Sequence, residues 1–249
     1  MSNLTSKTEI TTSSLVDEVK LLQNVAYANN LARYFKTGKG EYGEGDQFLG
    51  VKMPDLHTIV DKYYKHLAEG EVVDLFDSPF HEIRMVAALI LVRKYQKSLD
   101  IETKNTIYDV YLRLLPKLNN WDFIDLTAPK ILGAHLRDFY KIENSKDILI
   151  DLAKSNNLWK RRAALIATFA FIDKGESNIS LKLTNYYQRS DHDLLQKALG
   201  WMLREIGKRI DEKILTAFLD ENISKLSRTA LRYSIEKLHP DKRSYYINK

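Results

Sequence analysis

The sequence contains no cysteine, and this absence excludes several kinds of site. Without thiols the chain can form neither disulfides nor zinc or iron–sulfur centres held by thiolates. The six histidines are scattered along the 249 residues, and no two stand at metal-ligand spacing on one predicted helix. We therefore expect no metal and no cofactor.

Long apolar segments are lacking as well. No run approaches the ~18–20 residues that cross a bilayer, and no signal-peptide pattern opens the chain. The composition, with 44% hydrophobic and 29% charged residues, is that of an ordinary globular protein. We expect a cytoplasmic protein that does not bind membranes.

Glycine is scarce except in one stretch, residues 36–46, which holds four of the ten. Gly38, Gly40 and Gly43 match the G-x-G-x-x-G pattern of nucleotide-binding loops. However, no β-strand pattern precedes them, and the acidic residues among them would repel a pyrophosphate. We interpret the stretch as a surface loop.

Convincing strand patterns are absent from residue 48 onward, and the chain reads as short helices with brief breaks. An earlier helix is predicted over residues 15–34, and others over residues 55–67, 104–115 and 179–188.

A weak internal repeat organises these helices. A small residue, usually followed by an apolar one, recurs in the middle of a helix at intervals of 40, 36, 34 and 32 residues. These anchors are Ala88, Ala128, Ala164, Ala198 and Ala230. A Ser or Asn eight to ten residues before each of the first four is expected to cap its helix, namely Ser78, Asn119, Ser155 and Ser190.

Two helices in every thirty to forty residues are typical of an α-solenoid of the HEAT or armadillo type. We therefore predict an all-α fold, built as a HEAT-like superhelix of antiparallel helix pairs. It is expected to form a single domain over residues 1–249, with residues 1–14 flexible.

Positive charge is concentrated in the second part of the chain. Residues 151–249 carry 19 Lys and Arg against 12 Asp and Glu, whereas residues 1–150 carry 19 against 21. This distribution favours a polyanionic partner such as nucleic acid, although many basic domains bind none.

Trp121 and Asp125 are four residues apart and share one face of a predicted helix that begins at an asparagine pair. A π surface beside a carboxylate suits a site that stabilises positive charge. The alternative is a core tryptophan with a structural aspartate, bonded to Arg162 in a ladder between adjacent helices.

All three tryptophans lie in the predicted second helices of the repeats, which line the concave surface of such a superhelix. Arg162 follows Trp159 by three residues, and Lys197 and Arg204 flank Trp201 at helical spacing. A groove with aromatic rings, cations and one carboxylate fits a DNA or RNA backbone better than a peptide.

Three blocks of sequence resemble the DNA alkylation repair glycosylases of the AlkD type. The first is Trp-Asp-x-x-Asp at residues 121–125, followed by Pro-x-x-Leu-Gly at residues 129–133. The second is Leu-Trp-Lys-Arg-Arg-Ala-Ala at residues 158–164, and the third is Gln-Lys-Ala-Leu-Gly-Trp-Met-Leu-Arg-Glu at residues 196–205. With an N-terminal block at residues 32–54, the resemblance runs from about residue 20 to the C-terminus.

This resemblance implies a solenoid that holds duplex DNA in its concave face, as a monomer. It implies excision of cationic alkylated purines, chiefly 7-methylguanine and 3-methyladenine, in base excision repair. The family's catalytic aspartate falls on Asp125, and its two catalytic-cleft tryptophans fall on Trp121 and Trp201. Its phosphate-contacting arginine falls on Arg162 and a further cleft aromatic on Tyr34, and Lys197, Arg204 and Arg161 are lesser candidates for DNA contact. His57 stands where many relatives carry an arginine, which puts one peripheral contact in doubt.

Two other functions remain open. A catalytically silent relative would bind bent or branched DNA, and a protein–protein scaffold, the commonest use of HEAT-like solenoids, would have no DNA affinity. Retention of Asp125, Trp121 and Trp201 argues against the silent relative.

Overall fold

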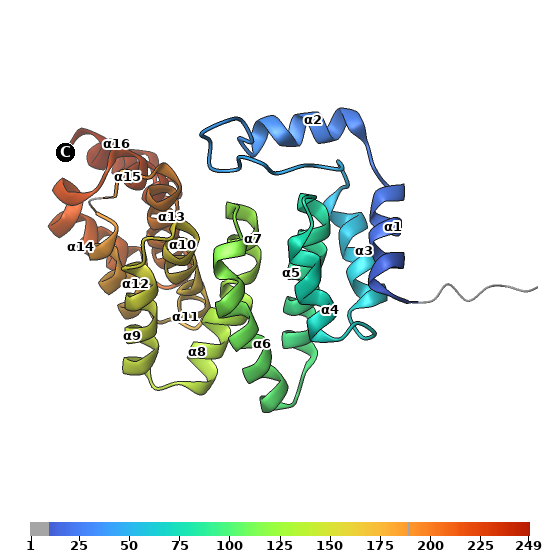
Figure 1. Ribbon diagram of the computed structural model, residues 1–249. Helices are drawn as coiled ribbons and strands as arrows, with labels where there is room; N and C mark the ends of the chain where they lie inside the picture. Colours follow the sequence, from blue (N-terminus) through green and yellow to red (C-terminus); the bar gives the residue numbers. More distant parts are fainter. Residues whose placement is uncertain (1–9, 189) are drawn as a thin grey trace, which may run out of the picture. The chain divides into compact units, whose positions relative to one another are not determined.

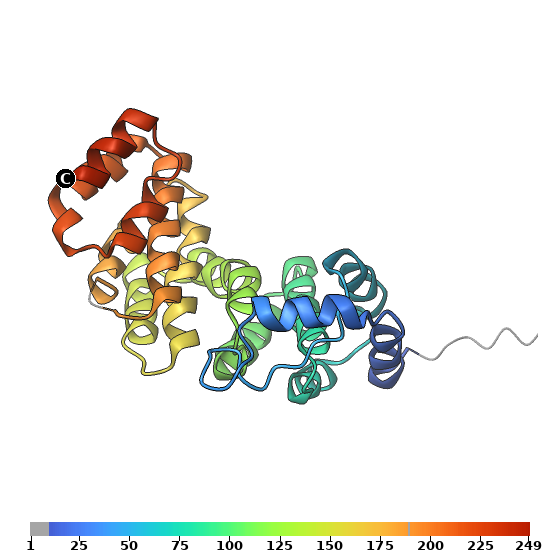
Figure 2. The same ribbon diagram turned by 90° about the horizontal axis from the view of Figure 1, so that it is seen from above.

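The computed structural model describes residues 10–188 and 190–249, and within them all regular structure is helical apart from one isolated β-bridge between Gln47 and Phe80 (Figure 1 and Figure 2). The prediction of an all-α solenoid is confirmed. The helices, with short 3₁₀ and π turns marked η, are α1 (Thr12–Leu21), α2 (Val25–Tyr34), α3 (Met53–Tyr63), α4 (Glu69–Asp74), η1 (Leu75–Asp77), α5 (His81–Lys97), α6 (Ile101–Leu114), η2 (Leu115–Lys117), α7 (Trp121–Thr127), η3 (Pro129–Gly133), α8 (Ala134–Phe139), α9 (Ile142–Ala153), α10 (Leu158–Ala167), α11 (Phe169–Ile172), α12 (Asn178–Leu183), η4 (Thr184–Tyr186), α13 (Asp193–Arg209), α14 (Glu212–Asn222), η5 (Ile223–Lys225), α15 (Arg228–Ser234) and α16 (Pro240–Asn248).

The helices gather into two compact units, one ending at Val110 and the other beginning at Tyr111. In the first unit α1, α3 and α5 pack against one another, and α4 packs on α5. Helix α5 is buried along most of its length, so it forms the core of this unit. A single domain over residues 1–249 remains a prediction.

The prediction of one helix over residues 15–34 is wrong. The structure has two helices there, because Asn24 takes an extended conformation and its side chain accepts the amide N–H of Tyr27 at 2.9 Å. An Asn in this position is a strong N-cap, and it starts α2 in a new direction.

The first helix begins earlier than predicted. Thr11 and Ser14 form a reciprocal capping box at the start of α1, so the end of the stretch predicted to be flexible, residues 1–14, is helical. Residues 1–9 lie outside the described residues. The predictions at residues 55–67 and 104–115 correspond to α3 and α6. The one at residues 179–188 corresponds to α12 and the turn η4.

The glycine-rich loop after α2 uses its own carboxylates to satisfy its backbone. Glu41 accepts the N–H of Gly38 at 2.9 Å, and Glu44 accepts the N–H of Gly40 at 2.8 Å. These are amides that a phosphate would need, so the loop is closed on itself and is no nucleotide cradle.

Two buried carboxylates tie this loop to α5. Glu82 accepts consecutive backbone amides, including Leu49 at 2.9 Å and Gly50 at 2.7 Å. Asp46 accepts a hydrogen bond from Arg84 at the first turn of the same helix. Charge-assisted bonds of this kind are stronger than neutral ones, so they fix the connection into α3.

In the second unit α7, α10, α13 and α15 lie side by side in chain order, with α9 against α10 and α14 against α13 (Figure 2). Two glycines allow this close stacking. A Cβ on Gly133 would collide with the carbonyl oxygen of Ala167, and one on Gly200 would collide with that of Ala230. The Leu-Gly pairs in the sequence blocks therefore mark points of helix contact.

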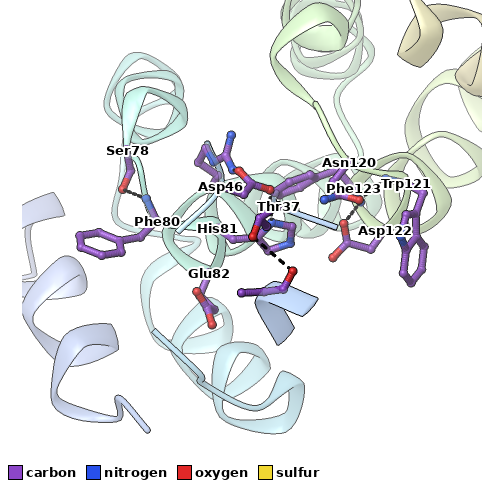
Figure 3. Close-up of polar contacts among 12 residues, drawn as sticks. Thr37, Asp46, Ser78, Phe80, His81, Glu82, Asn120, Trp121, Asp122 and Phe123 are labelled. Atoms are coloured by element: carbon purple, nitrogen blue, oxygen red, sulfur yellow. Dashed lines mark hydrogen bonds and ion pairs between the residues drawn. The ribbon is translucent and has the colours of Figure 1, made fainter. Parts of the chain in front are cut away.

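The predicted caps of the second helices are wrong by one or two residues, in a regular way. Ser78, Ser155 and Ser190 each accept the N–H of the residue two positions on, at 3.2, 3.1 and 3.4 Å. That residue is the actual N-cap. Figure 3 shows the hydrogen bond between Ser78 and Phe80. The repeated serines thus form small turns that lead into the helices.

None of the helices among the described residues has the length and apolar content needed to cross a membrane.

Candidate nucleic-acid interface and active site

Helix α7 buries one face and leaves the other partly open. Phe123 and Ile124 are fully buried, whereas Trp121 and Asp125 on the other face are only partly buried. Buried Asn120 starts the helix, with its side-chain oxygen accepting the N–H of Trp121 at 2.8 Å. The local sequence therefore places an aromatic ring and a carboxylate on the same, partly exposed face of α7.

Pro129 ends α7. It has no N–H to donate to the carbonyl of Asp125 four residues earlier, and a π turn, Pro129–Gly133, follows. The last turn of α7 is supported from α6, since the hydroxyl groups of Tyr111 and Thr127 are hydrogen-bonded at 2.8 Å in the core. π turns inside helical stretches are frequent at functional sites, and this one begins four residues after Asp125.

Arg162 of α10 holds the carboxylate of Asp125 by two parallel hydrogen bonds. Its Nε donates to Oδ1 at 2.9 Å, and its Nη2 donates to Oδ2 at 2.8 Å. The remaining Nη1 donates to the backbone carbonyl of Leu194 at the start of α13. The Asp–Arg ladder is thus present, and all three guanidinium nitrogens have protein partners. The phosphate contact of Arg162 remains a prediction.

The pair is unequally exposed. The side chain of Arg162 is 5% exposed and that of Asp125 is 16% exposed, so the carboxylate forms the open end. Burial raises the pKa of Asp125, while the charge and hydrogen bonds of Arg162 act against that rise. A partly open carboxylate with a fixed cation behind it can stabilise positive charge in front of it.

Trp201 of α13 is fixed by a carboxylate one turn further on. Its indole N–H donates to Glu205 Oε1 at 3.2 Å. Burial alone would raise the pKa of Glu205. The hydrogen bonds from Arg209 and Arg204, with their positive charges, outweigh burial and hold that pKa below its usual value. Arg204, a predicted DNA contact, also forms an ion pair with Glu236.

The remaining candidates are placed differently. Lys197 forms an ion pair with Asp193 at 2.7 Å, and the guanidinium of Arg161 lies 5.8 Å from the ring centre of Tyr187. Tyr34 is 65% exposed at the end of α2, in the first unit. All other candidate site residues lie in the second unit.

The structure adds three groups that the sequence analysis missed. Glu205 stands four residues after Trp201, a spacing that was visible in the sequence. The carbonyl of Leu194 is a backbone group, and no sequence pattern marks it as a ligand of Arg162. Trp159, in contrast, is 6% exposed and belongs to the core.

The third group is His192, the N-cap of α13, whose Nδ1 accepts the N–H of Leu194 at 3.2 Å. Burial lowers the pKa of His192, and the charges of Arg161 and Arg162 lower it further against the opposing effect of Asp193. This histidine is therefore neutral at pH 7. It adds a nitrogen to a basic region without adding a charge.

A metal centre has no candidate position among the described residues, which contain no group of three or more His, Asp or Glu side chains able to hold an ion.

A basic second unit is typical of proteins that bind nucleic acids. Comparison with known families makes the class specific. A family profile described as DNA alkylation repair enzyme matches residues 15–238. The chain belongs to this family.

A solved structure with the same fold is that of a predicted DNA alkylation repair enzyme from Enterococcus faecalis. It is 19% identical, superposes with a TM-score of 0.68, and the match covers 88% of this chain and 97% of that one. Comparison with curated proteins finds no match.

Proposed function

We propose that this protein is a DNA glycosylase that hydrolyses the N-glycosidic bond of cationic alkylated purines, such as 7-methylguanine and 3-methyladenine, in duplex DNA. It acts as a monomer, without a metal or cofactor. The family supports DNA repair chemistry in general, and the choice of reaction rests on the site.

One observation carries the proposal, namely the carboxylate of Asp125. It is oriented by the bidentate pair with Arg162, yet its side chain is 16% exposed. A carboxylate that only joins two helices can be fully buried. A carboxylate that faces a reacting sugar must be accessible from solvent.

The chemistry explains why one carboxylate is enough. A purine alkylated at N7 or N3 is already positively charged, so it leaves as a neutral base without a general acid. Ordinary glycosidases need a second carboxyl group for that proton. As the bond breaks, positive charge develops on the deoxyribose, where Asp125 stabilises it and positions the attacking water. Trp121 and Trp201 offer their electron-rich faces to the same cation.

Contacts with the DNA backbone complete the proposal. Arg162, Arg161, Lys197 and Arg204 supply cations along α10 and α13. Tyr34, at the end of α2, stays a separate predicted contact. Phosphate contacts position the duplex and carry no base information.

The test is release of free base from methylated duplex DNA by the parent and by Asp125→Asn. We expect the rate per folded molecule to fall ~10²–10³-fold, as when one electrostatic donor is removed from an oxyanion hole. The variant is also expected to lose about 1–3 kcal/mol of stability, because the buried cation of Arg162 keeps only a neutral partner.

Asp122→Asn is the matched control. Asp122 lies on the same helix and accepts the N–H of Phe123 through Oδ1 at 2.9 Å, a bond that Asn retains (Figure 3). The rate of base release by Asp122→Asn should stay within about twofold of the parental rate. If Asp125→Asn melts lower but releases base at the parental rate per folded molecule, Asp125 is structural and the proposal is wrong.

A second candidate has one observation in its favour. The side chains of Arg162, Lys197 and Arg204 all have acidic partners within the protein. This is expected of a scaffold, or of a silent relative that binds DNA structure. Binding without base release would favour the silent relative, and neither binding nor release would favour the scaffold.

A further inference from the structure

Glu205 is buried inside the second unit and contacts two of the candidate residues, Trp201 and Arg204. It is 5% exposed and lies four residues after Trp201 on α13, on the same helix face. Its Oε1 accepts the indole N–H of Trp201 at 3.2 Å, and its Oε2 accepts Nε–H of Arg209 at 2.8 Å.

The far side of this carboxylate is anchored in turn. Arg209 donates through Nη1 to Asp173 Oδ1 at 2.8 Å, and its guanidinium lies 4.7 Å from the ring centre of Phe169. The ring of Phe169 is 6.3 Å from that of Trp201, tilted by 45°. The four side chains of Trp201, Glu205, Arg209 and Phe169 therefore form a closed circuit between α11 and α13.

This circuit fixes the indole in two ways. The hydrogen bond at the ring edge sets the side-chain rotation, and the ring of Phe169 restricts it from the side. In addition, a negatively charged acceptor on the N–H increases the electron density of the indole face. Attraction of a cation to an aromatic ring depends on that density.

We propose that Glu205 is a positioning residue that aims the face of Trp201 at the developing sugar cation and strengthens its attraction for that cation. This inference rests on the glycosylase function proposed above. Glu205 itself touches neither substrate nor water in the reaction. It acts through Trp201.

The central variant is Glu205→Gln, which keeps the shape and one acceptor oxygen but removes the charge. Under single-turnover conditions with enzyme in excess, we expect base release to slow roughly 3- to 30-fold, the range of a cation–π contact. The dissociation constant for DNA should stay within about twofold, because the variant removes no cation and Arg204 keeps its ion pair with Glu236. A purely structural Glu205 would leave the rate per folded molecule unchanged, and that result would overturn the proposal.

Asp173→Asn is the matched control, since it removes the charge of a partner of Arg209 on the outer side of the circuit and leaves the hydrogen bond between Trp201 and Glu205 in place. It should retain the parental rate. If it slows base release as much as Glu205→Gln does, general loosening of α13 is responsible, and the proposal is wrong.

A double-mutant cycle with Trp201→Phe isolates the mechanism. Phenylalanine has no N–H for Glu205 to hold, so Glu205→Gln should cause no further loss of rate in that background. A full additional loss would mean that Glu205 acts by some other route than Trp201.

A spectroscopic measurement tests the contact without any activity. The indole N–H signals in a ¹H–¹⁵N spectrum are assigned by Trp→Phe variants, and that of Trp201 should be protected from exchange in the parent. It should shift and exchange faster in Glu205→Gln. Absence of protection in the parent would refute the positioning role even if the glycosylase function holds. Protection without base release would instead refute the glycosylase function.

Discussion

Arg162 donates hydrogen bonds to both oxygens of the Asp125 carboxylate, and its third nitrogen donates to the backbone carbonyl of Leu194. One guanidinium thereby joins α7, α10 and the start of α13. The pair is at once a structural tie and the most organised charge pair of the candidate site. The structural role and the proposed catalytic role of this pair can be separated by experiment, because the catalytic role makes the rate of base release depend on the protonation of Asp125.

The first prediction concerns that pH response. Burial raises the pKa of Asp125 and Arg162 opposes the rise, so Arg162→Gln should raise the pKa further. Base release needs the ionised carboxylate and is lost as pH falls through this pKa. The acid limb of the pH–rate profile should therefore move to higher pH in the variant. Single-turnover rates, corrected for spontaneous depurination, measure it. An acid limb that stays in place would show that protonation of Asp125 does not control the rate of base release.

Arg161 provides a contrast with its buried neighbour. It is partly exposed, and its guanidinium lies over the ring of Tyr187. Arg161→Gln should weaken binding to damaged and undamaged duplex equally and reduce the slope of log K against log salt by about 1. Fluorescence anisotropy over a salt series gives the slope. A loss confined to damaged DNA would make Arg161 a lesion contact instead.

Lesion choice follows from the proposed mechanism, in which no side chain acts as a general acid. His192 has a lowered pKa and is neutral at pH 7, so it has no labile proton to deliver to a departing base. General acid catalysis is typically worth ~10²–10⁴-fold, and neutral lesions such as hypoxanthine should be processed more slowly than 7-methylguanine by that order. Duplexes with one defined lesion each, assayed with enzyme in excess, make the comparison. Similar rates for both lesions would reveal a proton donor and contradict the mechanism.

Gly133 allows the π turn to approach the end of α10. An added Cβ would strike the carbonyl of Ala167 and lie 2.9 Å from the Cβ of Ala170, so Gly133→Ala should destabilise the protein by about 1–3 kcal/mol or more. Urea unfolding measures the change. Gly70→Ala is the control, because no atom lies near its Cβ, and there the helix should gain up to about 1 kcal/mol. Equal effects at both sites would mean that the contact at Gly133 is not tight.

Periodic features of this protein were predictable from its sequence. The anchors Ala164, Ala198 and Ala230 are fully buried in successive second helices, because apolar spacing reports which face is covered. Trp121 and Asp125 share a face for the same reason.

Local competition between hydrogen bonds was harder to predict. An asparagine inside an apolar stripe, such as Asn24, can either continue a helix or cap a new one, and packing decides between them. The spacing of Ser78, Ser155 and Ser190 predicts that they cap the helices, yet each accepts the N–H of the residue that precedes its helix. Spacing along the chain does not distinguish the two arrangements.

Contacts across helices were the least predictable. The sequence placed Lys197 and Arg204 beside Trp201, but the group that touches the indole N–H is Glu205. A carboxylate that accepts the N–H of a tryptophan is not marked by any charge pattern in the sequence.

The reach of Arg162 also has a consequence for how the chain is made. Its two partners lie 37 residues before it and 32 residues after it. Domains tend to fold from the N-terminus during synthesis. Asp125 therefore leaves the ribosome well before Arg162, and the arginine is fully tethered only once Leu194 has followed. The charge pair itself can form once Arg162 has emerged, but its third bond waits for Leu194, so a nascent protein stalled before α13 would hold the pair without its tether to that helix.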